Sequence, residues 1–128
     1  MGEIEKAMTF LRRYSVTRLL GNHVPYAVEA WPEGNQRHLS AESGLYGRIF
    51  TEGMFGIRPT GLHSFSLTPR LPEEWDRMAF RRIKAFGADF DIIVERVKGE
   101  MIRVKIEKAG KIVLNKKIKS GTRILCNI

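Results

Sequence analysis

The sequence predicts an α+β fold in which helices come first and an antiparallel sheet follows. Apolar residues recur at helical intervals in the first half of the chain, and after Gly61 they alternate with polar residues, as in a strand. The two kinds of segment form two consecutive blocks, whereas a parallel sheet requires strands and helices that alternate along the chain. We therefore divide the chain into a helical part, 1–60, and an antiparallel β part, 61–128.

The first predicted helix covers residues 3–20. Its apolar side chains follow a roughly helical period, and Gly21 directly after Leu20 is a typical stop signal. The residues that carry the period are Ile4, Ala7, Met8, Leu11 and, after an interval, Leu19.

The second predicted helix begins at Ser40, a good N-cap residue, and runs to about Phe55, where Gly56 and Pro59 end it. Gly44 and Gly47 would let a neighbouring helix approach closely. Apolar residues cover more than one stripe of this helix: Leu45, Tyr46, Ile49, Phe50, Met54 and Phe55. Such a helix needs neighbours on several sides, so we expect the helical part to expose an apolar surface or to be covered by another chain.

The remaining segments read as short strands separated by glycine-containing turns, which favours an antiparallel meander or sandwich. In the segment around Ile92, apolar and polar positions mostly alternate, which indicates a strand buried mainly on one side. The predicted strands are 62–68, 77–84, 88–97, 101–108, 111–118 and 122–127.

The charge is unevenly distributed. Residues 1–70 hold 8 Lys or Arg and 6 Asp or Glu, whereas residues 71–128 hold 14 and 8. Arg103, Lys105 and Glu107 alternate with apolar residues, which is typical of the solvated face of a strand rather than of a nucleic-acid surface. No stretch reaches the roughly 18 apolar residues of a membrane span, and the N-terminus lacks the features of a secretory signal. The single Cys126 excludes an internal disulfide and predicts a small buried residue.

The segment between the two predicted helices, 21–39, is rich in Gly, Pro and Asn and carries a candidate site. Glu29 lies between Tyr26 and Trp31, and a carboxylate among aromatic rings suits acid–base chemistry on a sugar. A surface glutamate in a loop that packed aromatics tether is the alternative. The three histidines have no metal-site spacing, and neither a nucleophilic serine motif nor a phosphate-binding loop occurs. We expect Trp75 to clamp the β part to its neighbour rather than to bind a ligand.

Two runs of sequence resemble a known group of enzymes. VEAWPEGNQRHLSAESGLYGRIFTEGMFGI, residues 28–57, is similar to the last barrel hairpin of glycoside hydrolases with six-hairpin (α/α)6 barrels, such as the glucoamylase-like families. LTPRLPEEWDRMAFRRIKAFGADFDIIVERVKGEMIRV, residues 67–104, resembles the C-terminal β-domain of bacterial α-L-fucosidase-like and α-L-rhamnosidase-like enzymes. The resemblance implies that the chain is the C-terminal part of such an enzyme: the last helices of an (α/α)6 barrel, followed by an antiparallel, sandwich-like β-domain.

The resemblance also implies a site and its partners. Glu29 matches the general base, and the expected reaction is hydrolysis of a glycosidic bond with inversion. Tyr26 and Trp31 would line the sugar pocket, His23 or Arg37 would bind hydroxyl groups, and Glu42 is the alternative to Glu29 as the catalytic carboxylate. The expected partners are an oligosaccharide or polysaccharide and the missing N-terminal part of the barrel; no cofactor, metal, nucleic acid or membrane is expected. The parent enzyme would be periplasmic or secreted.

The sequence departs from that family in two ways. Such a barrel needs about twelve helices, and this chain supplies only one or two. It also offers no candidate for the general acid, so we expect the chain alone to be inactive. A β-sandwich accessory or carbohydrate-binding module without catalytic activity is the alternative function. That module would need exposed aromatic rings on a strand face, whereas the strand phenylalanines mostly alternate as core residues: Phe65, Phe80, Phe86 and Phe90.

Overall fold

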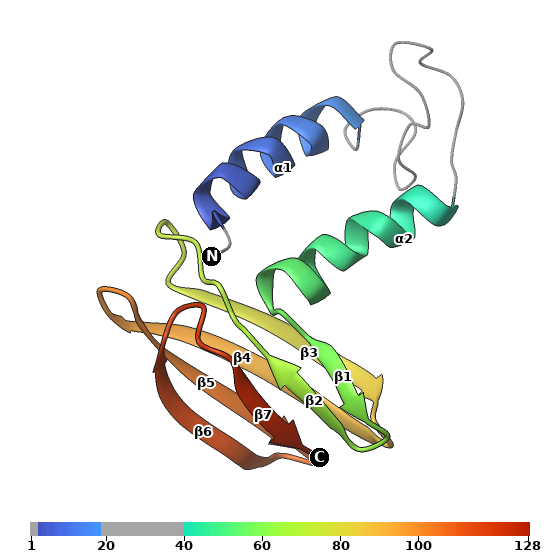
Figure 1. The fold of residues 1–128 in the computed structure, drawn as a ribbon, viewed down its shortest axis with the longest axis vertical. Helices are drawn as coiled ribbons and strands as arrows, with labels where there is room; N and C mark the ends of the chain where they lie inside the picture. Colours follow the sequence, from blue (N-terminus) through green and yellow to red (C-terminus); the bar gives the residue numbers. More distant parts are fainter. Residues whose placement is uncertain (1–2, 19–39) are drawn as a thin grey trace.

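The computed structural model describes residues 3–18 and 40–128. Helix α1 (Ile4–Arg18) and helix α2 (Ser40–Arg48) lie over one end of two layered sheets (Figure 1). Helix α2 continues into a π-helical segment, η1 (Ile49–Met54). The strands that follow are β1 (Arg58–Gly61), β2 (Ser64–Leu67), β3 (Arg77–Ala85), β4 (Ala88–Lys98), β5 (Met101–Lys108), β6 (Lys111–Lys119) and β7 (Ile124–Asn127).

Both sheets are antiparallel. The smaller has the strand order β1-β2-β7, and the larger is a meander with the order β3-β4-β5-β6. The predicted α+β class with an antiparallel sheet is therefore confirmed. Within residues 3–18 and 40–128 the only helices are α1, α2 and η1, so the described part of the chain contains no barrel. None of these helices is long and apolar enough to cross a membrane.

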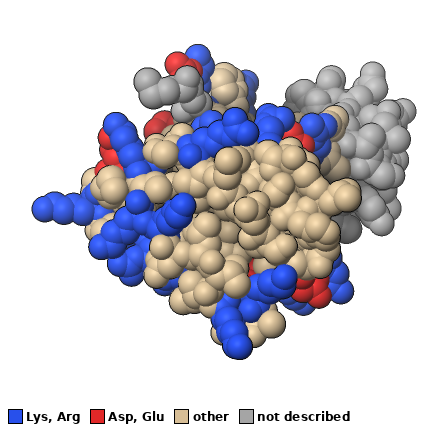
Figure 2. Space-filling model, turned by 60° about the horizontal axis from the view of Figure 1, so that its bottom comes forward, with Lys and Arg blue, Asp and Glu red and all other residues tan. Residues whose placement is uncertain are grey.

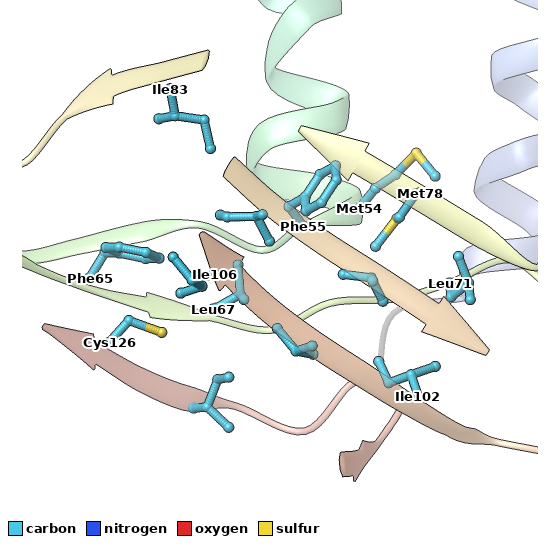
Figure 3. Packing of buried hydrophobic residues seen from close by; sticks show 14 of the residues in the cluster. Met54, Phe55, Phe65, Leu67, Leu71, Met78, Ile83, Ile102, Ile106 and Cys126 are labelled. Carbon is cyan, nitrogen blue, oxygen red and sulfur yellow. The ribbon is translucent and has the colours of Figure 1, made fainter. Parts of the chain in front are cut away.

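The core lies between the two sheets, because alternate residues of β4 and β5 point toward β2 and β7 (Figure 3). On the larger sheet, Ile92 is paired with Ile106 and Val94 with Val104, and all four side chains have no exposed surface. On the smaller sheet, Phe65 is paired with Cys126. Cys126 is buried as predicted, and its burial raises the pKa of the thiol to about 11.

The end of the second helix follows from the conformation of one glycine. Phe55 N–H donates to the carbonyl of Phe50 over 2.9 Å, which completes the wider π-helical turn. Gly56 then adopts φ +64°, and a Cβ there would lie 2.5 Å from the carbonyl oxygen of Thr68. Any other residue would have a strained backbone at this φ, and its Cβ would collide with the backbone of Thr68. The predicted end near Phe55 is therefore right, although its last turn is π-helical rather than α-helical.

The sequence did not predict β1. Pro59 was interpreted as a helix terminator, yet it lies inside β1 and is paired with Phe65 of β2. Proline is tolerated there because β1 is an edge strand of the smaller sheet. The segment predicted as one strand, 62–68, therefore begins with the turn of a β1–β2 hairpin.

Candidate functional site

The residues assigned to the sugar site from the sequence lie outside the described residues: Glu29, Tyr26, Trp31, His23 and Arg37. Glu42 lies within α2, but its side chain is outside the described part as well. The assignment of general base and sugar-binding residues therefore stays a prediction. The described residues instead define the junction at which the helices meet the sheets.

A groove of 670 Å³ lies at this junction, between the second helix and strand β3. One wall is formed by Gly44 and Gly47 of α2 together with Phe50 of η1, and the opposite wall includes Met78 and Phe80 of β3. A Cβ placed on Gly44 or Gly47 would meet no atom within 4 Å. The close helix approach that these glycines predict is therefore not made within the described part of the chain.

Trp75 lines this groove and also a second cavity of 310 Å³ between α1 and Tyr46 of α2. The arginine of β4, Arg96, fixes the backbone around it. Its guanidinium donates to the carbonyls of Pro72 and Trp75 over 2.5 and 3.1 Å and to that of Gly99 over 3.0 Å. The Arg96 N–H also donates to the carbonyl of Asp76 over 2.8 Å. The tryptophan thus stands between helices and sheet on a rigid loop, as the predicted clamp requires.

The same loop holds α1. Glu5 accepts the N–H of Glu73 over 2.9 Å, and Arg12 forms an ion pair with Glu74. The hydrogen bond from Arg12 to Glu74 raises the pKa of the Arg12 guanidinium, with the charge of Glu74 acting in the same direction. Met8 and Leu11, on the side of α1 that faces the junction, are buried. Helix α1 therefore depends on a loop of the β part as well as on α2.

Aromatic rings connect the two helices. Tyr14 and Tyr46 stack with their ring centroids 5.8 Å apart, and Tyr46 meets Phe50 edge to face at 5.3 Å. The hydroxyl groups of Ser15 and Tyr46 are 2.9 Å apart and share a hydrogen bond. These contacts explain why α1 and α2 lie close together although 21 residues of sequence separate their ends.

Among the described residues that line the large groove, none is a carboxylate. Glu52, the acid beside the groove on η1, forms a bidentate ion pair with Arg48. Its two carboxylate oxygens lie 2.5 and 3.0 Å from the guanidinium nitrogens. The hydrogen bond from Arg48 lowers the pKa of Glu52, and the charges of Arg48 and Arg58 add to the effect against partial desolvation. No group of three His, Cys, Asp or Glu that could hold a metal ion occurs among the described residues. The described walls of the groove are therefore suited to apolar packing.

Sequence reasoning missed Arg96. It occupies the inward-facing register position of β4, after Phe90, Ile92 and Val94, at which an apolar residue is expected. A charged residue in an apolar row is itself a signal, because a buried guanidinium needs several acceptors. The alternative of a carbohydrate-binding strand face gains no support, since Phe65, Phe80 and Phe90 of the strands and Phe86 of the β3–β4 turn are buried or partly buried.

No family model, no curated protein and no solved structure matches the chain. The likeness to six-hairpin glycoside hydrolases therefore rests on the two quoted runs of sequence. What the described residues add is the shape and the chemistry of the junction.

Proposed function

We propose that the chain is the C-terminal part of an inverting glycoside hydrolase whose (α/α)6 barrel is completed by helices outside this chain. In this enzyme Glu29 is the general base, and it takes a proton from the water that attacks the sugar from the face opposite the leaving group. The general acid comes from an earlier loop of the barrel. The two carboxyl groups would stand roughly 6.5–9.5 Å apart, which leaves room for the water.

The observation that carries the proposal is the apolar surface of the helices. Phe10 and Val16 of α1 are 61% and 65% exposed, and Leu45 of α2 is 58% exposed. Single exposed apolar residues are ordinary. Here, however, they lie on two adjacent helices that also line three hollows, because a third cavity of 250 Å³ separates α1 from η1. Helices with this much uncovered apolar surface are typical of a bundle from which neighbours are missing.

The junction supports the same proposal from the other side. The loop that carries Trp75 belongs to the run LTPRLPEEW, which is part of the resemblance to the β-domains of these enzymes. Its glutamates, Glu73 and Glu74, hold α1, and its tryptophan lines the cavities on both sides of α2 and η1. A β-domain that supports the last helices of a barrel needs a contact like the one between this loop and the helices.

The test is a substitution in the proposed full-length enzyme. The sequence of that enzyme would be obtained from the DNA upstream of Met1. Glu29→Gln keeps the shape of the side chain but removes the proton acceptor, so turnover should fall by about 100-fold or more. Glu33→Gln, four residues away in the same segment, is the matched control and should cost far less. Substrate binding should survive the Glu29→Gln change, because the amide is nearly isosteric with the acid.

Three results would contradict the proposal. The first is an upstream reading frame that encodes no further helical hairpins. The second is normal turnover by the Glu29→Gln enzyme, which would move the assignment of general base to Glu42. The third is glycosidase activity from the 128-residue chain alone, because the proposal places the general acid outside it.

A further inference from the structure

Four strands form the edges of the two sheets, and β6 differs from the other three. Strands β1 and β7 have four residues each, and β1 also contains Pro59. The ladder of β3 is broken after Phe80 by a bulge in which Arg82 adopts φ +55°. In β6, residues 114–119 are paired with β5 without a break, and the register shift of this strand lies before them. Short strands, prolines and bulges protect an edge against further pairing, and this run of β6 has none of them.

The register shows which backbone groups of β6 lie at the free edge. Ser120 N–H donates to the carbonyl of Glu100 over 2.8 Å, so this pair and every second pair along the ladder exchange hydrogen bonds. The pairs between them do not, and their members on β6 direct N–H and C=O away from β5: Asn115, Lys117 and Lys119. The carbonyl of Lys119 accepts a hydrogen bond within the turn that follows. Asn115 and Lys117 therefore offer donors and acceptors to a further strand, since no strand in the described part of the chain pairs with that side of β6.

The side chains of this run alternate between the two faces of the sheet. On the core face, Leu114 and Ile118 are partly exposed, and Lys116 between them is exposed. On the outer face lie Lys117 and Lys119, both exposed. A strand added at this edge would cover the two apolar side chains and would bring its own side chains opposite cations on both faces. The pattern that suits this edge is therefore a strand in which acids alternate with apolar residues.

The lysines of β6 make its edge selective for the charge of a partner. The strand contains four lysines and no acid, and among the described residues only Lys119 of the four forms an ion pair, with Glu100 at 2.7 Å. A second copy of β6 would place lysine opposite lysine, which is destabilising, whereas carboxylates in those positions stabilise. The net charge of +8 favours an acidic partner at longer range, and Figure 2 shows a face of the molecule on which Lys and Arg are frequent and acids are sparse. A proline would exclude every partner strand, but these lysines admit an acidic one.

We propose that β6 binds an extended acidic segment of a partner protein, which joins the larger sheet as a fifth, antiparallel strand. Acids of the segment lie opposite Lys117 and Lys119, and its apolar residues cover Leu114 and Ile118. Main-chain hydrogen bonds to Asn115 and Lys117 supply affinity, and the alternation of side chains supplies specificity. This binding is separate from the proposed glycosidase activity and does not require it.

The test is binding of the 128-residue chain to a labelled peptide of about seven residues in which Glu and Val alternate, measured by fluorescence anisotropy. The peptide should bind, and its affinity should fall as salt rises from roughly 50 to 200 mM. A peptide of the same composition, with its Glu and Val residues in two separate blocks, should bind about tenfold more weakly, and a peptide with Lys in place of Glu should not bind. Heparin, an anionic chain that cannot form a strand, should bind more weakly than the alternating peptide.

Methylation of the peptide nitrogens tests strand addition without changing the protein. In an antiparallel pairing, the residues opposite Asn115 and Lys117 are the acids, and their N–H groups donate to β6. Methylation of the Glu nitrogens should therefore lower the affinity by about tenfold or more. Methylation of the Val nitrogens, which point away from β6, is the matched control and should leave most of the affinity.

Substitutions in β6 test the same contact from the side of the protein. Lys116→Glu/Lys117→Glu should reverse the preference, so that the Lys-containing peptide binds and the Glu-containing one does not. The control Lys6→Glu/Arg13→Glu changes the net charge equally on α1 and should keep the original preference. A melting temperature close to that of the unchanged chain shows that each variant is folded.

The proposal is overturned by any of four results. The first is that the alternating peptide does not bind, and the second is that it binds no more tightly than the block peptide or heparin. The third is that the two methylated peptides bind equally. The fourth is that the α1 control reverses the preference as the β6 variant does.

Discussion

The β-sandwich and the helical region differ in how completely their apolar side chains are buried. In the β-sandwich, Phe65 and Leu67 of the smaller sheet pack in the same core as the central inward side chains of β4 and β5, which have no exposed surface: Ile92, Val94, Ile102, Val104 and Ile106. In the helical region, Met8, Leu11 and Met54 are buried, but Phe10, Val16 and Leu45 remain in solvent. This difference is what we expect if, as proposed, the helices have further neighbours and the two sheets do not.

The largest expected effect of a substitution is in the sandwich core. Ile106→Ala removes a fully buried side chain between the two sheets and should lower the free energy of unfolding by about 2–5 kcal/mol. Leu45→Ala on α2 is the matched change and should cost less than about 0.5 kcal/mol, because Leu45 is already exposed. Urea denaturation followed by circular dichroism measures both changes. Equal losses in the free energy of unfolding would contradict the difference between the two regions.

The next largest effect is at the junction. Arg96→Met keeps the length of the side chain but leaves the carbonyls of Pro72, Trp75 and Gly99 without their donor. We expect a loss of about 1–3 kcal/mol in the free energy of unfolding. Arg77→Met on β3 is the control. In a Trp31→Phe background, Trp75 emission should shift to the red only in the Arg96 variant, and an unchanged spectrum would show that Arg96 does not hold the loop.

A third prediction concerns association. The exposed apolar side chains of the helices should bind an apolar dye and cause the 128-residue chain to self-associate at high concentration. Phe10→Ser/Leu45→Ser should reduce both effects and change stability by less than about 0.5 kcal/mol. Leu62→Ser/Leu125→Ser, which removes exposed leucines of the smaller sheet instead, should reduce them less. If light scattering finds a monomer and the chain binds no apolar dye, these results would count against an incomplete helical region.

The smallest predicted effect is a pH dependence on the outer face of the larger sheet. The hydrogen bond from Lys105 lowers the pKa of Glu95 below its usual value of 4.5, and Arg77 and Arg103 add to the effect against desolvation. A lowered pKa in the folded state means that this stabilisation is present above pH 4.5 and is lost as the pH falls through the folded-state pKa. Glu95→Gln should remove about 0.2–1 kcal/mol at neutral pH and nothing at pH 2, as measured by thermal melts. An equal loss at both pH values would exclude the ionic contribution.

The sandwich could be predicted from the sequence because its strands are local patterns. Period-two runs such as 101–108 and the glycines of the turns locate β3 to β6 to within a residue at each end. Strand β1 was not predicted, because Pro59 argues against a strand unless the edge position of that strand is known. Arg96 and the π-helical turn depend on which groups meet in space, and a linear pattern does not contain that information. The catalytic assignments fall outside the described residues and stay predictions.

We propose that the sandwich is a complete unit and that the helices are part of a larger one. Native-state hydrogen exchange on the 128-residue chain tests it most directly. We predict that amides of β4 and β5 exchange only through global unfolding, whereas those of α1 and α2 exchange much faster, through local opening. In the proposed longer enzyme, the helices should become as protected as the strands. Equal protection of α2 and β5 in the 128-residue chain would contradict the claim.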